Sequence, residues 1–440
     1  MPNDILQNDG TPLFEREIRR FTSKMWALEG YFPLVMKLIS IKLFGDIKKE
    51  EEYINSHGIS SSDGEQQEDI VTIPEDKISR FLDIEKSLSS SMAAVELFPI
   101  NIVMAFVSQY DAYLGRLIKL IYSEKPELLN GSEKNISFAE MNSYTSIQEI
   151  KDYIVEKEVE SVLRGSHKEH FIWLEKKMNI TLTKDLPNFN TFLEIMERRN
   201  LFAHNDGVVS SQYLKIIKEY TNDYTANITH GERLKVDVDY FLKCYNVIFE
   251  IGVKLGHVIW RKYKPEETSN ADTHLINVCF DLIVNEDYNL AINILDFAIN
   301  TPPLRKNSSQ KVICYHTINK ALALYLKNNQ KACEEVLSQY DWSATGDIFA
   351  LAVSVLREDY ELAFQLMKNI GPNKEELGKE AYLNWPIFKK FRKAEGFSEI
   401  YKDVFGEEMV YVEKKPNRLE DILSDLNDVK KMINKNDISI

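Results

Sequence analysis

Glycine and proline are scarce in this chain of 440 residues, which contains only 17 and 13 of them. Stretches in which apolar and polar residues alternate, the pattern of a half-buried strand, are also few. Apolar residues instead recur mainly at spacings of three and four, as on one face of a helix. These absences exclude a sheet-rich chain, and we predict an all-α fold. The chain is too long for one ordinary hydrophobic core, so we expect two or three domains.

The chain has few residues that suit a metal or a disulfide. Its four cysteines are Cys244, Cys279, Cys314 and Cys333. None belongs to a C-x-x-C pair or has a histidine at zinc-finger spacing, so we expect buried free thiols. His167 and His170 are three residues apart, but no cysteine or carboxylate pair nearby completes a metal site. A glycine-rich phosphate loop is lacking as well. We therefore predict a protein without a metal or another cofactor.

Long apolar runs are lacking too. The first residues show no basic stretch followed by an apolar core, so we expect no signal peptide. The most apolar early stretch, residues 31–44, is interrupted by Pro33, Lys37 and Lys42. It is also shorter than the roughly 20 residues that a membrane span needs. We therefore expect a cytoplasmic protein without membrane contact.

The net charge of −14 argues against a protein that coats nucleic acid without preference. The charge is unevenly distributed, because residues 96–265 carry 22 basic and 23 acidic side chains, whereas both flanking segments are acidic. A local phosphate-binding surface is therefore easiest to place in the middle segment.

Composition and periodicity divide the chain into four predicted segments. Their bounds are 1–95, 96–265, 266–412 and 413–440. The first should contain helices, with a break near Pro33 and a flexible acidic loop near residues 45–76. The second should be a helical bundle, and the third a set of α-α repeats.

The third segment contains an imperfect repeat. Residues 285–291 (NEDYNLA) are echoed by residues 357–363 (REDYELA), and residues 328–332 (NNQKA) occupy an equivalent place between them. The pattern resembles tetratricopeptide-type hairpins, whose repeat is about 34 residues. We predict that Ala291, Ala332 and Ala363 allow close helix packing. A generic α-α domain is the alternative.

The terminal segment 413–440 is amphipathic. Its apolar residues recur at spacings of three and four, as in a coiled-coil seam. They are Leu419, Ile422, Leu426, Val429 and Ile433. We predict a helix that docks on the chain's own repeats, with a dimerising or partner-binding helix as the alternative.

The helix expected at residues 191–204 carries the candidate site. Thr191 and Glu194 match a capping box, with a hydroxyl at the N-cap and a glutamate three residues later. Residues 205–207 (Asn-Asp-Gly) are typical of a helix that ends in a left-handed turn, which places His204 in the last turn.

Three polar side chains of this helix suit work on a phosphodiester. Asn200 and His204 are four residues apart, on the same side of the helix. Arg199 points about 100° away from Asn200, but its long side chain can swing toward the helix end. A histidine can move a proton, and an arginine can neutralise charge on phosphate oxygens. Arg199, Asn200 and His204 are therefore the candidate catalytic residues.

The surrounding sequence resembles the R-polar-x3-H motif of the HEPN superfamily. Residues 197–207 read ERRNLFAHNDG, with long predicted helices at 98–122 and 238–263. The resemblance covers residues 96–265 and implies a metal-independent endoribonuclease that acts on RNA. It also implies a homodimer through this domain, in which two motifs meet, and a role as a toxin or in phage defence.

The resemblance also implies roles for single residues. Arg199 would bind phosphate, Asn200 would orient it, and His204 would be the general acid or base. Tyr213 would supply the aromatic residue that often follows the motif. Some relatives have a tyrosine two residues after the histidine that a partner enzyme modifies. Asp206 takes that place here, which disfavours such control.

Other residues meet the loose spacing of the motif. Arg198 precedes His204 by six residues, and Arg164 precedes His170 by the same distance. A Gly-Ser pair makes a poor helix between Arg164 and His170, so we expect both to be uninvolved. Asp111 could orient a site residue, but we expect it to be an ordinary surface charge.

Three functional hypotheses follow. The first is the homodimeric endoribonuclease, regulated by a protein partner on the helical repeats. The second is a non-catalytic interaction module in which Arg199 and His204 are structural. The third is one half of a toxin–antitoxin pair, controlled by modification or by a bound neighbour.

Overall fold

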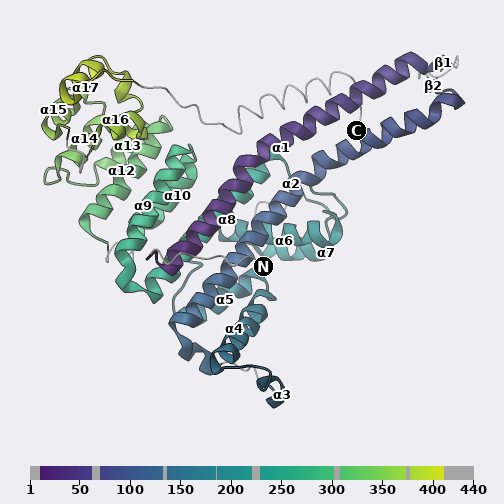
Figure 1. Cartoon of the computed structure of the whole chain (residues 1–440), viewed down its shortest axis with the longest axis horizontal. Helices are drawn as coiled ribbons and strands as arrows, with labels where there is room; N and C mark the ends of the chain where they lie inside the picture. Colours follow the sequence, from purple (N-terminus) through teal and green to yellow (C-terminus); the bar gives the residue numbers. More distant parts are fainter. Residues whose placement is uncertain are drawn as a thin grey trace. The chain divides into compact units, whose positions relative to one another are not determined.

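The computed structural model describes residues 10–61, 70–131, 136–184, 186–220, 228–301, 308–372 and 377–410. In these residues the fold is all-α, as predicted (Figure 1). The sheet found among them is a two-stranded antiparallel ribbon of β1 (Ile59–Ser61) and β2 (Ile70–Thr72). The chain forms two compact units. The bundle unit comprises residues 19–119 and 131–251, and the repeat unit comprises residues 1–18, 120–130 and 252–416.

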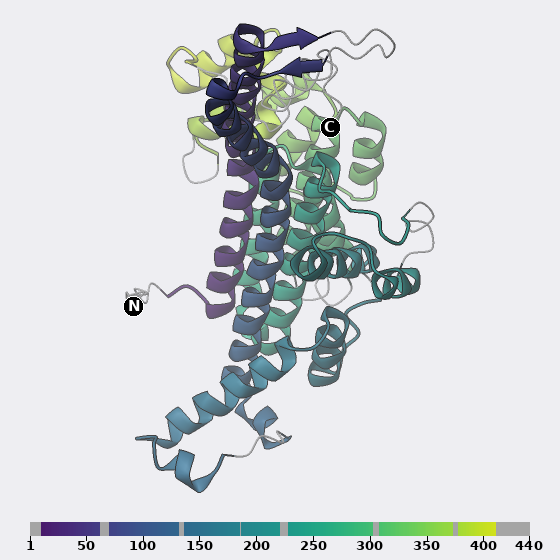
Figure 2. The same cartoon turned by 90° about the vertical axis from the view of Figure 1, so that its right-hand side faces the viewer.

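Two long helices dominate the bundle unit. They are α1 (Leu13–His57) and α2 (Glu75–Glu124), which run side by side with the β1–β2 ribbon at their far ends (Figures 1 and 2). Buried aromatic rings hold α1 in place. Phe21 stacks on Tyr113 with ring centroids 4.5 Å apart, and Phe32 stacks on Phe241 at 3.9 Å. The core of this unit therefore lies between α1, α2 and α8 (Val238–Tyr263).

The helices α1 and α2 correct three predictions. Helix α1 does not break at Pro33 and continues to His57, so the flexible loop expected near residues 45–76 is wrong over its first part. An interior proline costs a helix about 3 kcal/mol. Burial of Phe32 and Met36 on either side of the proline offsets this cost. Helix α2 runs through residues 95 and 96, so no boundary lies there.

Helix α2 also contains an 18-residue stretch with a mean hydropathy of 1.7, of which 33% is buried. By length and composition alone, this stretch is long and apolar enough to cross a membrane. The expectation that long apolar runs are lacking is therefore wrong for α2. Core helices of helical bundles have the same apolar character.

Shorter helices complete the bundle unit. They are α3 (Phe138–Met141), α4 (Ile147–Leu163), α5 (His167–Met178), α6 (Phe189–Asn205) and α7 (Ser211–Tyr220). Helix α5 begins after Ser166, whose hydroxyl accepts from the backbone of Glu169 while the Glu169 carboxylate accepts from the backbone of Ser166. This capping box separates α4 from α5. It also places Arg164 and His170 on opposite sides of a chain turn.

In its described residues, the repeat unit contains three helical hairpins. They are α9 (Thr268–Val284) with α10 (Tyr288–Asn300), α12 (Gln310–Leu326) with α13 (Gln330–Leu337), and α14 (Asp347–Leu356) with α15 (Tyr360–Ile370). Each hairpin turns through one residue with positive φ, at Glu286, Asn328 and Glu358, where φ is 66°, 59° and 59°. The repeat seen in the sequence is therefore a repeat of turn geometry.

The turns also correct the register of the repeat. Ala291, Cys333 and Ala363 each lie five residues after the positive-φ residue of their turn, and all three are fully buried. Ala332 is only half-buried. Cys333 therefore fills the small-residue position of the second hairpin, one residue later than predicted.

The repeat unit closes with short elements after the third hairpin. They are α16 (Lys379–Asn384), two 3-10 turns (Pro386–Phe388 and Phe391–Lys393) and α17 (Phe397–Phe405). The amphipathic helix predicted at residues 413–440 lies outside the described residues.

Candidate functional site

The end of α6 has the predicted form. The helix ends at Asn205, and Asp206 and Gly207 follow with φ of 51° and 76°. His204 therefore lies in the last turn, where its side chain is exposed. A Cβ atom at Gly207 would come within 3.0 Å of the Leu234 carbonyl oxygen. Both the positive φ and this close approach require glycine at this position.

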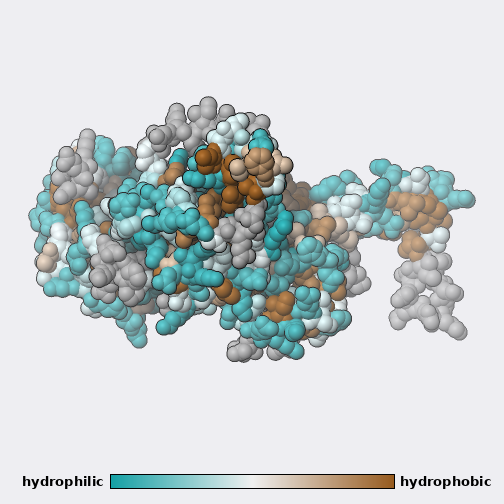
Figure 3. Space-filling model, turned by 90° about the horizontal axis from the view of Figure 1, so that it is seen from below, coloured by the Kyte–Doolittle hydropathy of each residue, from teal (hydrophilic) through white to brown (hydrophobic). Residues whose placement is uncertain are grey.

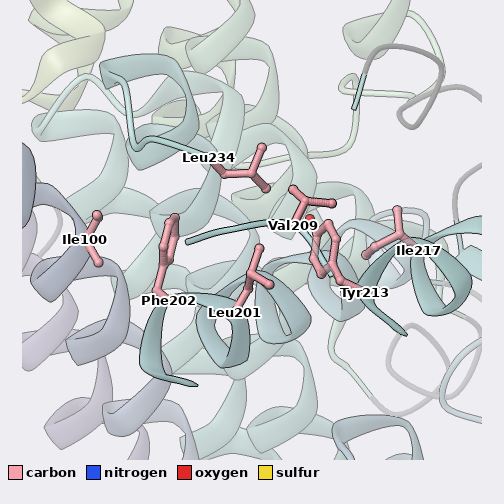
Figure 4. Close-up of a cluster of buried hydrophobic side chains, with 7 residues drawn as sticks. All are labelled: Ile100, Leu201, Phe202, Val209, Tyr213, Ile217 and Leu234. Atoms are coloured by element: carbon pink, nitrogen blue, oxygen red, sulfur yellow. The ribbon is translucent and has the colours of Figure 1, made fainter. Parts of the chain in front are cut away.

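A small apolar cluster fixes the end of α6 (Figure 4). Leu201 and Phe202 of α6 pack with Tyr213 and Ile217 of α7 and with Ile100 of α2. These contacts bury the side of the helix end that carries Leu201 and Phe202. His204 and Asn205 are left on the exposed side.

The beginning of α6 differs from the prediction. The helix starts at Phe189, so Thr191 lies within the first turn and forms no capping box. The N-cap residue Asn188 instead donates its side-chain amide to Glu250, at 2.9 Å. Glu194 is buried and accepts from the hydroxyl of Tyr240, at 3.1 Å. Tertiary contacts therefore replace the expected local cap.

Arg198 belongs to the same buried network. Its Nε lies 2.9 Å from a Glu194 oxygen, and its guanidinium carbon lies 3.8 Å from the centre of the Tyr240 ring. Tyr240 and Glu194 raise the pKa of Arg198 against the opposing effect of burial. Arg198 is therefore a core residue, and Arg199 is the arginine of the motif that reaches the surface.

The guanidinium of Arg199 is held by Asp111 of α2. Its terminal nitrogen donates to Asp111 Oδ2 at 3.1 Å, and the Arg199 side chain is 24% exposed. Among the described residues, the buried Nε of Arg199 has no hydrogen-bond acceptor. Asp111 is thus not the ordinary surface charge that we predicted. It fixes an arginine that still has an unsatisfied donor.

Two histidines complete this cluster. His167 Nε2 lies 2.8 Å from Asp111 Oδ1, so one carboxylate bridges His167 and Arg199. His170 lies beside His167, with ring centroids 4.9 Å apart, and is buried. His170 is thus packed beside the cluster, and its lack of a part in the activity stays a prediction. The sequence gives no local signal for this meeting, because Asp111 lies 56 and 88 residues from its two partners.

The three candidate catalytic residues occupy different environments. Arg199 is tied to Asp111, Asn200 is half-buried, and His204 is exposed at the helix end. Residues five apart on a helix point about 140° from each other. Arg199 and His204 of one chain therefore do not converge on one compact pocket.

The pH dependence of stability should report on His170. Burial, reinforced by His167, lowers the pKa of His170 to about 4. In the unfolded chain the imidazole titrates near 6.5. The folded state therefore binds fewer protons between these values, and its stability falls as the pH drops through this window.

Between pH 7 and pH 4, we expect the unfolding free energy of His170→Phe to fall less than that of wild type. The difference should be on the order of 1–3 kcal/mol. Denaturant unfolding of both proteins at several pH values measures the difference. If the unfolding free energies of wild type and variant fell equally with pH, burial of His170 would not explain the loss of stability in acid.

No group of three His, Cys, Asp or Glu side chains is placed to hold a metal ion in the described part of the chain. The four cysteines are free and buried, as predicted. No family model, curated protein or solved structure matches this chain.

Proposed function

We propose that the chain is a metal-independent endoribonuclease that uses Arg199, Asn200 and His204. The observation that carries the proposal is the state of Arg199. Its guanidinium is partly exposed and held in place by Asp111. An arginine fixed in this way is suited to bind phosphate oxygens. The toxin or phage-defence role remains what the HEPN resemblance implies.

The chemistry follows from the two exposed groups. In RNA, the 2′-hydroxyl can attack the neighbouring phosphorus, which breaks the bond to the 5′-oxygen of the next nucleotide. His204 would take or supply the proton that moves in this step. Arg199 would neutralise the charge that grows on the phosphate oxygens. Asp111 and His167 would position Arg199, because the carboxylate contacts both.

A homodimer is part of the proposal. Since Arg199 and His204 diverge along one helix, a compact site needs groups from a second chain. A two-fold axis beside the end of α6 would bring two copies of the motif together. RNA is the expected substrate, and a protein partner is expected on the helical repeats.

One observation favours the non-catalytic alternative. Asp111 already engages the Arg199 guanidinium, as it would in a purely structural ion pair. In that case the chain is an interaction module built on its helical repeats. Activity measurements on purified protein separate the two functions.

We expect RNA cleavage to survive EDTA, because side chains rather than a metal would move the proton and neutralise the charge. The products should end in a 2′,3′-cyclic phosphate, and DNA should be inert, since it lacks the 2′-hydroxyl. Purified protein incubated with total RNA, with and without chelator, tests this. Activity that EDTA abolishes and magnesium restores would overturn the proposed mechanism.

A further inference from the structure

Helix α1 carries an exposed apolar stripe on its outer face. Its members, which together we call the α1 stripe, are Tyr31, Leu34, Leu38, Ile41 and Phe44. Each exposes between 44% and 67% of its surface. The opposite face of the same helix is already buried, through Phe21, Phe32 and Leu43 among others. An exposed helix face this apolar marks an interaction surface.

The α1 stripe borders a groove between α1 and α2. The groove has a volume of about 570 Å³, and Leu38, Lys42, Ser87 and Ala94 contribute to its walls. Apolar side chains also reach the surface on the projecting end of the α1–α2 hairpin (Figure 3). A long helix laid along α1 would cover the stripe and fill the groove, as a third helix does in a bundle.

The terminal segment of this chain has the matching pattern. The α1 stripe repeats at spacings of three, four, three and three, and residues 419–433 repeat at three, four, three and four. As helices, the two seams would span about 20 and 21 Å, at 1.5 Å per residue. Residues 413–440 lie outside the described residues, so only their sequence enters the match.

Charge favours this segment over a second copy of α1 packed in parallel. The exposed side chains of Lys42, Lys48 and Lys49 flank the stripe, where they form ion pairs with Asp46 or Glu52. Two α1 helices packed in parallel would bring these lysines near one another. The first half of the terminal segment is acidic instead, at Glu420, Asp421, Asp425 and Asp428. Opposite charges beside the apolar seams of two helices favour the packing of these helices on each other and set their relative orientation.

The repeats offer a different kind of surface. Their cavity, lined by Phe280, Asn319 and Trp385 among others, has a volume of about 280 Å³. It is a compact pocket and not a stripe of helical length. We therefore propose that the α1 stripe is the docking site of residues 417–440 of the same chain. This inference is independent of the proposed ribonuclease activity.

The experiment places the photo-cross-linking amino acid p-benzoylphenylalanine at position 38 of the full chain. Irradiation should join position 38 to a peptide from residues 417–440, as identified by mass spectrometry. An equal mixture of isotopically light and heavy chains tells whether the two peptides belong to one molecule. We expect links within a single chain.

A matched pair of variants completes the test. Leu426→Asp with Val429→Asp places charges in the apolar seam and should lower the yield of this cross-link about 10-fold. Ser424→Asp, on the opposite side of the same expected helix, should leave the yield unchanged. Links between light and heavy chains, links to other segments, or an unchanged yield in the double variant would overturn the proposal.

Discussion

His204→Ala is expected to abolish RNA cleavage and to leave the fold intact. Loss of a general acid or base typically slows a reaction by about 10²–10⁴-fold. The side chain is exposed at the end of α6, so its removal should change the unfolding free energy by less than about 0.5 kcal/mol. The measurement compares single-turnover cleavage of labelled RNA with denaturant unfolding of the same preparation.

His57→Ala is the matched control, because His57 also lies in the last turn of a long helix in the bundle unit. It should cleave RNA at the wild-type rate. If His204→Ala unfolds like wild type and still cleaves at the parent rate, the ribonuclease proposal is wrong. The interaction module then becomes the better description.

Arg199→Lys is expected to lower the cleavage rate by about 10²–10³-fold, a loss typical of removing one donor aimed at developing charge. Lysine keeps the positive charge but lacks the planar fork, which in the proposed site would contact Asp111 and phosphate oxygens at once. Thermal unfolding should change little, because the Arg199–Asp111 pair is partly exposed and such pairs contribute at most about 1 kcal/mol.

The neighbouring arginine provides the control. Arg198→Ala should lower the unfolding free energy by about 3–5 kcal/mol, because it removes the cationic partner of the buried Glu194 carboxylate. We therefore expect Arg198→Ala to lose stability, and Arg199→Lys to lose activity while it keeps its stability. Equal cleavage rates for Arg199→Lys and wild type would contradict the role of Arg199 in phosphate binding.

Alanine substitutions at the same two residues test the homodimer. Equal amounts of Arg199→Ala and His204→Ala chains form mixed dimers in half of the assemblies. If each catalytic pair takes its arginine from one chain and its histidine from the other, a mixed dimer holds one intact pair. Mixing the two inactive proteins should then restore about a quarter of the wild-type activity. No recovery after verified subunit exchange would contradict a shared site.

The sequence by itself determined the features that depend on neighbouring residues. Scarce glycine and proline and the spacing of apolar residues determined an all-α chain. The residues at 205–207 determined where α6 ends, because a left-handed turn has strong local preferences. The repeated NEDYNLA-like segments indicated helical hairpins, and all three turns share one positive-φ geometry.

Only the tertiary structure decided the features that depend on distant residues. Pro33 predicts a helix break, yet burial of Phe32 and Met36 on either side of it keeps α1 continuous. Thr191 reads as a cap, yet the contact between Asn188 and α8 starts the helix earlier. In each case burial of apolar side chains, or a long-range hydrogen bond, outweighs a local preference of a few kcal/mol at most.

The candidate site divides in the same way. The motif placed His204 at an exposed helix end, because that depends on the turn that follows it. The motif selected Arg199 through the polar residue that follows it, but local sequence could not tell which of the adjacent Arg198 and Arg199 is buried. Packing against Glu194 and Tyr240 buried Arg198 and left Arg199 to meet Asp111. Because Asp111 also contacts His167, this cluster connects the three helices α2, α5 and α6, and no local sequence pattern predicts such contacts.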